Sequence, residues 1–341
     1  MVVAVDAMGG DYAPEAVVRG ALHAAQCGIA VQLYGKAEII KEILTFRDGN
    51  WRGLPIAIVD CSQTIAMGDE PAKSILIKKD ASLVRALKDL QRNQVHSVVT
   101  AGNSGAALVG GMLIVKCVTG VLRPALGVVL PTVKGEVFCV DVGANTDCKA
   151  EYLKQFAFMG HAYISLYKNM KHPRIGLLSN GTEQYKGSLV AKKAYTLLQK
   201  IEAIHFIGNV EPECFFKHKA DVFVVDGFVG NVFLKTVQAV IAHVSTFIVG
   251  DKEKKSTLEL RKNLNSAHTG GALLCGLQQP LIVSHGSSSE DAIYRSICYA
   301  QTLVKNDFFN SFKTNVETLL SNDQTWLSRS LNHLLHSRRS S

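Results

Sequence analysis

The sequence lacks paired cysteines: its eight cysteines include no Cys-x-x-Cys spacing and are scattered through apolar segments. This pattern is typical of reduced thiols and argues against a disulfide framework or a zinc site. No apolar run approaches the roughly 20 residues of a membrane-spanning helix, and no basic segment precedes the first apolar strand pattern. We therefore expect a cytoplasmic chain without a secretory signal or a transmembrane span.

The fingerprints of several enzyme classes are also missing. No Gly-x-Gly-x-x-Gly follows an apolar segment, no Walker loop is present, and residues 102–105 lack the frame of a Gly-x-Ser-x-Gly elbow. Dinucleotide, nucleotide and serine-hydrolase functions are disfavoured for that reason. No two histidines stand at metal-ligand spacing. Four aspartates have the chemistry to hold Mg²⁺, but a structural role explains each equally well, so we expect no catalytic metal; they are Asp6, Asp11, Asp141 and Asp147.

The net charge favours an acidic partner. Lys and Arg number 37 against 29 Asp and Glu, which gives +8 and would attract nucleic acid, an anionic membrane or an acidic protein. No zinc-finger spacing or RNP-like aromatic motif is present, and basic residues alternate with acidic ones on predicted helices, so we expect no nucleic-acid partner. A basic helical stretch at 73–88 is either a solvated surface or a docking face for an anionic partner.

An apolar segment that ends in a loop rich in Gly, Asp or Asn occurs five times. The central one, at 137–147, is short enough for a buried strand and is followed by a helical pattern from Lys149. In a parallel α/β sheet such loops lie at the carboxyl ends of the strands, where ligands bind. We therefore expect five loops to converge on one site; they lie within 2–11, 98–105, 137–147, 175–183 and 222–231.

The alternation of strand and helix patterns over 341 residues predicts a single α/β unit with a mostly parallel sheet. Strand patterns at 126–130 and 137–140 flank a turn with Pro and Gly, which predicts an antiparallel insert. An apolar helical pattern followed by a charged one predicts a projecting helical hairpin at about 232–265, and C-terminal helices are expected at about 290–336.

The loops have the composition of an anion site. The turns beside helix starts offer backbone N–H groups, and Lys186 and Lys235 each lie near one of these turns in the sequence. Such a combination suits phosphate. A reacting carbonyl also needs donors aimed at its oxyanion, and Lys186 and Asn231 have that chemistry. A single Gly, Asn or Asp at the end of a strand is usually a turn former, but five such loops together favour a site. Cys148 has the chemistry to carry an acyl group but no neighbouring histidine, and His285 either acts as a base or orients the turn after it.

These motifs, taken in order, resemble the PlsX family of bacterial phosphate acyltransferases from residue 3 to about residue 304. The resemblance implies a phosphotransacetylase-like fold of the isocitrate/isopropylmalate dehydrogenase superfamily, an α/β/α sandwich, and a homodimer. It also implies transfer of a long-chain acyl group from acyl-carrier protein to inorganic phosphate for phospholipid synthesis, with no cofactor beyond the carrier's phosphopantetheine thioester. The motifs are Val5-Asp-Ala-Met-Gly-Gly-Asp11, Ala101-Gly-Asn-Ser-Gly105, Asp141-Val-Gly-Ala-Asn145 with Asp147, Gly181-Thr-Glu183 with Lys186-Gly187, Asp226-Gly-Phe-Val-Gly-Asn231, Gly270-Gly271 and His285-Gly-Ser-Ser288.

The loops and the resemblance together predict the site. Phosphate attacks the thioester directly, Lys186 stabilises charge in the transition state, and the catalytic residues are Lys186, Asn231 and His285. Other residues are expected to bind substrate or phosphate, or to hold the loops in shape. They are Asp6, Gly9, Gly10, Asp11, Gly102, Asn103, Ser104, Gly105, Asp141, Gly143, Asn145, Asp147, Glu183, Asp226, Gly227, Gly230 and Lys235.

Membrane contact and two other functions stay open. Residues 251–255 are charged where the family's hairpin tip is apolar, which argues against insertion into a membrane but not against attraction to anionic lipid or to the acidic carrier. The alternative functions are an acyl-coenzyme A-dependent phosphotransacetylase and an inactive scaffold for lipid-synthesis partners, such as a downstream glycerol-3-phosphate acyltransferase.

Overall fold

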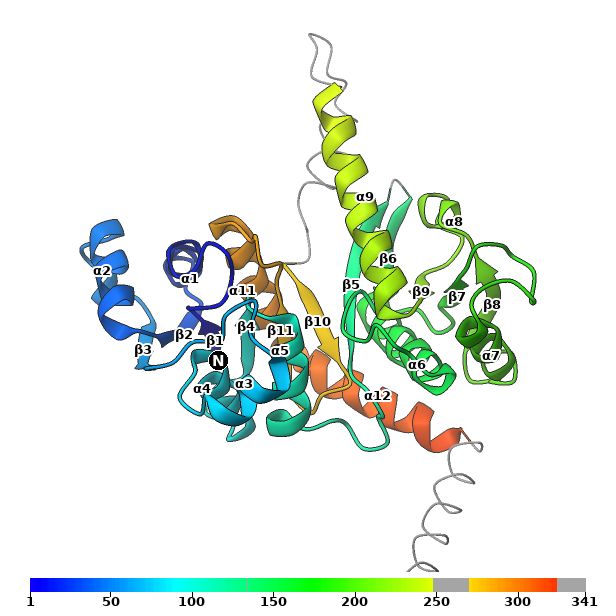
Figure 1. The fold of residues 1–341 in the computed structure, drawn as a ribbon, viewed down its shortest axis with the longest axis horizontal. Coiled ribbons are helices and arrows are strands. Elements are labelled where there is room, and N and C mark those ends of the chain that lie inside the picture. Colours follow the sequence, from blue (N-terminus) through cyan, green and yellow to red (C-terminus); the bar gives the residue numbers. More distant parts are fainter. Residues whose placement is uncertain (133, 248–269, 324–341) are drawn as a thin grey trace, which may run out of the picture.

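The computed structural model describes residues 1–132, 134–247 and 270–323. In this part of the chain, helices cover both faces of one open sheet (Figure 1). The strands are β1 (Val2–Asp6), β2 (Ala30–Gly35), β3 (Ile56–Asp60), β4 (Ser97–Thr100), β5 (Ala125–Thr132), β6 (Gly135–Val140), β7 (Arg174–Leu178), β8 (His205–Val210), β9 (Val222–Val224), β10 (Ala272–Cys275) and β11 (Leu281–Val283). The helices are α1 (Glu15–Gln26), α2 (Ala37–Arg47), α3 (Pro71–Ile77), α4 (Ser82–Gln91), α5 (Ser104–Gly110), α6 (Ala150–Tyr167), α7 (Leu189–Leu198), α8 (Glu213–Phe216), α9 (Gly227–Phe247), α11 (Glu290–Val304) and α12 (Phe308–Asn322), with short helical turns η1 (Trp51–Gly53), η2 (Gly111–Val115) and η3 (Lys305–Asp307).

The sheet has two halves that run in opposite directions. Its order is β3-β2-β1-β4-β11-β10-β5-β6-β9-β7-β8. The strands from β3 to β11 pair in parallel, as do those from β6 to β8, whereas β10 is antiparallel to both neighbours and β5 is antiparallel to β6. The loops after β1, β4 and β11 therefore leave one edge of the sheet, and those after β6, β7 and β9 leave the other. The expectation that all five loops meet at one edge is wrong.

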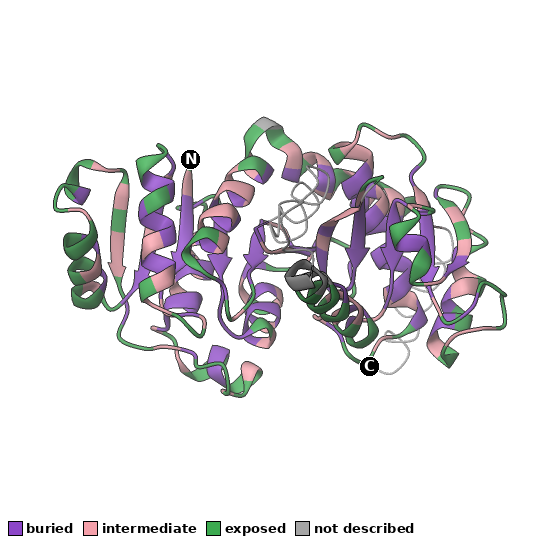
Figure 2. Cartoon of the chain, turned by 90° about the horizontal axis from the view of Figure 1, so that it is seen from above, coloured by how far each residue is buried: buried purple, intermediate pink, exposed green. Residues whose placement is uncertain are grey.

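Buried strands pack on both faces because successive side chains of a strand point to opposite sides. Val3 and Val5 of β1 belong to one core cluster and Ala4 to the other. Residues of α1, α2, α6, α7, α11 and α12 complete the first cluster, and residues of α3, α4, α5, α8 and α9 complete the second. Figure 2 shows the buried residues gathered in the strands, with exposed residues on the outer surfaces of the helices. Burial on both faces explains why the strand patterns are continuous apolar runs.

Several predicted elements have counterparts in the structure. The antiparallel insert is the β5–β6 hairpin, in which Gly127 pairs with Val140 and Thr132 with Gly135. The first limb of the predicted helical hairpin is α9, which projects from the sheet in Figure 1. The rest of that hairpin, residues 248–265, lies outside the described residues. The C-terminal helices are α11 and α12; from residue 324 the predicted range to 336 also lies outside them.

Two regions depart from the sequence patterns. β10 is a four-residue strand between Gly271 and Gly276, both at positive φ, and these flanking glycines hide it from a pattern analysis. The helical stretch after Met67 is divided, because α3 ends at Ile77 and α4 begins at Ser82. In this basic stretch Lys78 pairs with Asp69 and Arg85 with Asp80. This internal pairing favours the solvated-surface interpretation.

Candidate active site

A cavity of about 530 Å³, here called the central pocket, lies beside β5 between the two halves of the sheet. Leu126 and Val128 of β5 line it from the sheet. The loops after β1, β4 and β11 supply one side, and the loop after β6 with the first turns of α9 supplies the other. The pocket thus combines residues from both halves. The predicted site residues that line it are Asp11, Gly102, Ser104, Gly143, Asn231, Lys235 and His285.

Asp141 holds the loop after β6 in shape. Its fully buried carboxylate accepts bonds from the backbone N–H groups of Leu126, Gly143, Ala144 and Asn145, at 2.8 to 3.1 Å, and from Asn145 Nδ2 at 2.8 Å. Burial raises the pKa of Asp141, and these bonds act in the opposite direction. Because every partner is a donor, the carboxylate is needed as an acceptor. Asp141 is therefore a support of the pocket and does not line it.

Helix α9 approaches this loop so closely that two positions require glycine. A Cβ on Gly230 would lie 1.9 Å from the carbonyl oxygen of Asp141, and one on Gly227 would lie 2.5 Å from that of Asn145. The approach brings Asn231 to the pocket, where its Nδ2 donates to the carbonyl oxygen of Val142 at 3.2 Å. An amide nitrogen has two hydrogens, so Asn231 keeps a second one for a ligand.

Asp6 and Asn103 are buried supports of the opposite side. Asp6 accepts from Ser82 Oγ at 2.6 Å and Thr100 Oγ1 at 2.8 Å, and burial raises its pKa. Asn103 caps α5 by accepting from Ala106 N at 3.0 Å. Its Nδ2 donates to the carbonyl oxygens of Met67 and Asp69 at 3.1 and 3.0 Å. These contacts fix the loops that carry Gly102 and Ser104 to the pocket.

The start of α11 borders the pocket. Ser289 caps this helix by accepting from Ala292 N at 3.3 Å, and both residues line the pocket together with Ser287 and Ser288. A helix N-terminus carries partial positive charge and free N–H groups, so it attracts anions. The exposed side chain of Lys235 adds a positive charge, whereas Asp11 is the acidic side chain in the lining. This arrangement suits an anion with hydrogen-bonding oxygens.

His285 has a defined tautomer. Its Nδ1 lies 2.7 Å from Ser287 Oγ and accepts from the backbone N–H of Ser287 at 3.3 Å. Because a backbone N–H can only donate, Nδ1 is an acceptor, and the neutral ring then carries its proton on Nε2. Through Nδ1, His285 orients the turn that contains Ser287, and its Nε2–H group remains as a hydrogen-bond donor. The structure therefore favours a hydrogen-bonding role for His285 over that of a general base.

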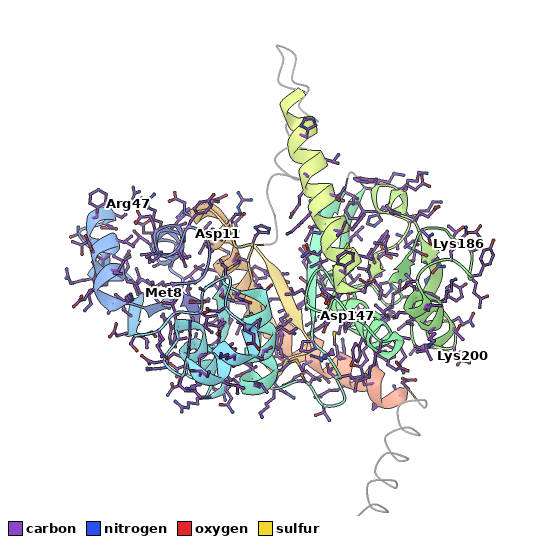
Figure 3. The ribbon with its side chains drawn as sticks, viewed as in Figure 1. Met8, Asp11, Arg47, Asp147, Lys186 and Lys200 are labelled. Carbon is purple, nitrogen blue, oxygen red and sulfur yellow. The ribbon has the colours of Figure 1, made fainter. Side chains whose placement is uncertain are left out.

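Lys186 lies outside the central pocket. Figure 3 shows Asp11 and Lys186 in opposite halves of the molecule. The loop after β7 that carries Lys186 borders a second cavity of about 810 Å³, here called the apolar pocket, through Ser179, Asn180 and Gly187. Asp226 also lines this second cavity. The five loops are thus divided between two pockets, and α9 contributes residues to both.

Comparisons with known proteins identify the family. Residues 1–311 match the family described as "Fatty acid synthesis protein". A phosphate acyltransferase of Geobacillus thermodenitrificans is 37% identical over 332 residues, which cover 93% of this chain and 99% of the relative. One of Dictyoglomus turgidum is 40% identical over 319 residues, covering 89% and 94%. The chain belongs to the phosphate acyltransferase family. It is an acyltransferase, as the sequence motifs predict.

Solved structures confirm the phosphotransacetylase-like fold. A phosphotransacetylase from Streptococcus pyogenes aligns with a TM-score of 0.61 and 17% identity, covering 89% of this chain and 94% of that one. The EutD phosphotransacetylase from Staphylococcus aureus aligns with a TM-score of 0.56 and 16% identity, covering 93% and 94%. At these identities the likeness establishes the fold alone. This chain thus has the fold of the phosphotransacetylases.

The remaining predicted residues do not line the central pocket. Asp147 and Glu183 are exposed, and the Glu183 carbonyl oxygen accepts from Asn209 Nδ2 at 2.8 Å. Asp226 caps α9 by accepting from Phe228 N and Val229 N at 3.1 and 2.9 Å. Asn145 is buried and donates to Pro124 O. The small residues Gly9, Gly10 and Gly105 pack against neighbouring loops or helices, where a side chain would meet Asp6, Ala101 and Pro71 respectively.

Cys148 is unsuited to carry the acyl group of this acyltransferase. Burial raises the pKa of its thiol to about 12, and its Sγ contacts Asn145 O at 3.4 Å. A nucleophilic cysteine needs a lowered pKa, because the thiolate is the reactive form. The structure therefore disfavours the acyl-cysteine alternative.

Within residues 1–132, 134–247 and 270–323, no three His, Cys, Asp or Glu side chains gather as metal ligands would. The same part of the chain contains no helix that is both long and apolar enough to cross a membrane. The absence of a catalytic metal and of a cofactor stays a prediction of the sequence.

Sequence reasoning missed several residues of the central pocket. Met67, Gln238 and Ser289 line it without belonging to the predicted set. Ser289 had a signal, since a serine directly before Glu-Asp-Ala is typical of a helix N-cap. Met67 and Gln238 had no such signal, because their proximity depends on tertiary contacts of the loop before α3 and of helix α9.

Proposed function

We propose that this chain transfers a long-chain acyl group from acyl-carrier protein to inorganic phosphate, with phosphate bound in the central pocket. The observation that carries the proposal is the position of the α11 N-terminus, with Ser287 and Ser289, across the same pocket from Asn231 and Lys235. Phosphate is already ionised at neutral pH and needs positioning more than activation. The family to which the chain belongs fixes the class of reaction, and this pocket offers donors for its anionic substrate.

In the proposed reaction a phosphate oxygen attacks the thioester carbonyl carbon. A C–O bond forms, the C–S bond breaks, and the electron pair leaves with sulfur, which takes the proton released by hydrogen phosphate to become the carrier's thiol. The second hydrogen of Asn231 Nδ2 and the Nε2 hydrogen of His285 are the donors for phosphate or for the carbonyl oxygen as charge develops. Ser104 supplies a hydroxyl at the start of α5.

Acyl-carrier protein is the proposed donor because the chain carries a net charge of +8. An acidic carrier would be attracted to the basic chain. This attraction raises the association rate at low ionic strength and is weakened by salt.

The resemblance to the family also suggests a homodimer. Analytical ultracentrifugation would test this by measuring the mass of the protein in solution. Peripheral attraction to anionic lipid depends on 251–255, outside the described residues, and vesicle flotation would test it.

The phosphotransacetylase-like fold makes acyl-coenzyme A the second candidate donor. One experiment distinguishes the two donors. The protein is incubated with phosphate and either palmitoyl-carrier protein or palmitoyl-coenzyme A, and any acyl phosphate is trapped with hydroxylamine as the hydroxamate. A reaction without phosphate corrects for direct attack of hydroxylamine on the thioester. Hydroxamate formed preferentially from the carrier supports the proposal, and formation only from coenzyme A supports the alternative. No product from either donor would overturn both and leave the scaffold function.

A further inference from the structure

We infer that the apolar pocket beside α9 binds the hydrocarbon chain of the acyl substrate. This inference rests on the proposed function, because it names where one part of that substrate lies. The central pocket combines glycines, serines and the side chains of Lys235 and His285 with apolar residues such as Leu126 and Leu234. Its polar groups suit phosphate and the reacting carbonyl, so we look for the place of the hydrocarbon chain in the second cavity.

The apolar pocket has the volume and surface that a chain requires. Its cavity of about 810 Å³ lies between α9 and the ends of β7, α7 and α8, within the range of roughly 300–1,000 Å³ found for small-molecule sites. One face of α9 lines it at helical spacing with Val229, Val232, Phe233, Val237 and Val240. The opposite face of the same helix turns Asn231, Leu234, Lys235 and Gln238 to the central pocket. One helix therefore separates an apolar site from a polar one.

The apolar lining is exposed to a degree that calls for an occupant. Val232 and Val240 are each 52% exposed, and Phe216 across the cavity is 53% exposed. Scattered exposed apolar residues are ordinary, but a contiguous set around a cavity marks a binding site for an apolar ligand. Because the lining extends along three turns of α9, an elongated ligand fits it better than a compact one.

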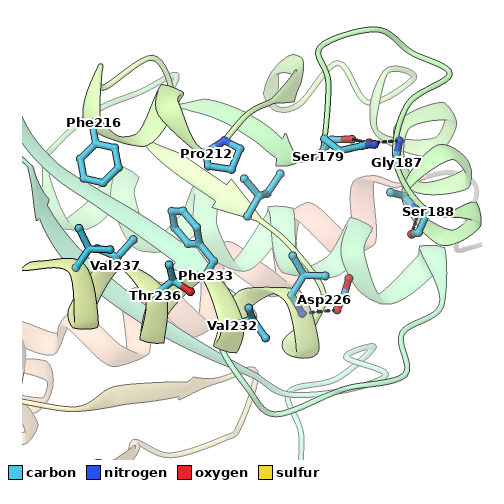
Figure 4. Close-up of a pocket in the computed structure, with 15 residues that line it drawn as sticks. Ser179, Gly187, Ser188, Pro212, Phe216, Asp226, Val232, Phe233, Thr236 and Val237 are labelled. Carbon is cyan, nitrogen blue, oxygen red and sulfur yellow. Dashed lines mark hydrogen bonds between the residues drawn. The ribbon is translucent and has the colours of Figure 1, made fainter.

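The pocket has polar groups at one end and apolar groups at the other. In Figure 4, Ser179, Gly187 and Ser188 lie at one end, and Phe216 and Val237 lie at the other. Gly187 N donates to Asn180 Oδ1 at 2.9 Å at the polar end, next to Lys186 in the chain. A fatty acyl group has the same division, with a polar carbonyl head and an apolar tail.

The first turns of α9 border both pockets. Asp226, directly before α9, lines the apolar pocket, and Asn231, five positions later, lines the central pocket. A chain whose tail lies along Val237 and Val240 would place its head near this end of the helix, between the loop of Lys186 and the phosphate in the central pocket.

Replacing Val240 with tryptophan tests the inference. Val240→Trp fills the apolar end, so the ratio of rates for palmitoyl- and octanoyl-carrier protein should fall, on the order of tenfold for each two methylene groups that lose their contacts. Ala239→Trp is the matched control, because the exposed Ala239 lies on the same turn and lines neither pocket. Thr236→Trp, nearer the middle of the cavity, should affect shorter chains as well. An unchanged ratio in both pocket variants would overturn the inference.

Binding of a fluorescent fatty acid separates this inference from the proposed function. The linear polyene cis-parinaric acid should gain fluorescence with the wild-type chain and with Ala239→Trp, be displaced by palmitate, and bind at least tenfold more weakly to Val240→Trp, on the order expected for lost methylene contacts. If the wild type binds the probe in this way but forms no acyl phosphate, the proposed function fails and the pocket stands. Equal binding by all variants, or a change of sedimentation mass in Val240→Trp without a change in probe binding, would overturn the inference; the latter outcome would mark a contact between copies of this chain.

Discussion

Gly143 and Asn231 are matched in shape: a Cβ built on Gly143 would lie 2.6 Å from Asn231 Nδ2. Gly143 also has a φ of +143°, a conformation that side chains rarely adopt. The pair joins the loop after β6 to α9 at the edge of the central pocket. The position of the Asn231 amide is therefore set by the absence of a side chain at Gly143.

Gly143→Ala should reduce turnover by displacing Asn231. Removing one donor to a developing oxyanion costs on the order of 100-fold in kcat, so Asn231→Ala and Gly143→Ala should each lose about that much. Because both changes remove the same interaction, the double variant should lose much less than the product of the two. Steady-state acyl phosphate formation measures this. Fully multiplicative losses would show that Gly143 does not act through Asn231.

Lys186→Ala should lose most of the turnover and leave the fold intact. A cation that stabilises transition-state charge contributes on the order of 100-fold or more. Lys186 is partly exposed, so its replacement should cost the fold little. Lys193→Ala, on the exposed side of the nearby α7, is the matched control and should keep full activity. Circular dichroism checks the fold of both. Activity of Lys186→Ala close to wild type would remove Lys186 from the mechanism.

Gly230→Ala should push α9 away from the β6 loop, since its Cβ would lie 1.9 Å from the Asp141 carbonyl oxygen. We expect a loss of about 1–3 kcal/mol in the free energy of unfolding, although alanine is otherwise the better helix former, together with a large loss of activity. Gly49→Ala is the control, because no atom lies within 4 Å of the position its Cβ would take. Denaturant unfolding would compare the two variants. If Gly230→Ala were as stable and as active as Gly49→Ala, the close approach of Gly230 to Asp141 would not position α9.

Asp221 should make the stability of the second half of the sheet sensitive to acid. Burial acts to raise its pKa, but the bonds from Arg174 N, Nε and Nη2, at 2.8 to 3.0 Å, outweigh burial, and the pKa is lowered. A carboxylate with a lowered folded-state pKa contributes stability above its unfolded pKa, about 3.9, and loses it as the pH falls through the folded-state value.

Asp221→Ala should therefore lower the free energy of unfolding by about 3 kcal/mol at pH 7, because it leaves Arg174 without its partner. The difference from wild type should shrink as the pH falls below about 3.9. Guanidinium unfolding at several pH values measures it. Glu213→Ala, which breaks the exposed pair with Lys217, is the control and should change little. A difference that stays constant down to pH 2 would contradict the linkage.

The sequence predicts every strand except β10, the antiparallel insert and several of the residues that line the central pocket, because apolar periodicity and turn residues are local signals. It does not predict that the two halves of the sheet run in opposite directions, since this depends on β10, a four-residue strand between glycines. It also does not predict that Asn231 lines the central pocket while the loop that carries Lys186 borders the other cavity. Whether a buried residue such as Asn103 or Asn145 supports a loop or faces the ligand depends on contacts distant in sequence, and no local pattern carries that information.

The central claim is direct transfer of the acyl group from the carrier thioester to phosphate. Mass spectrometry of the intact proteins after mixing stoichiometric amounts of this chain and palmitoyl-carrier protein tests it most directly. The account predicts that the carrier loses its acyl mass only when phosphate is present, that one acyl phosphate forms for each carrier deacylated, and that the mass of this chain does not change. Deacylation of the carrier without phosphate, with a matching gain of the acyl mass on this chain, would contradict it.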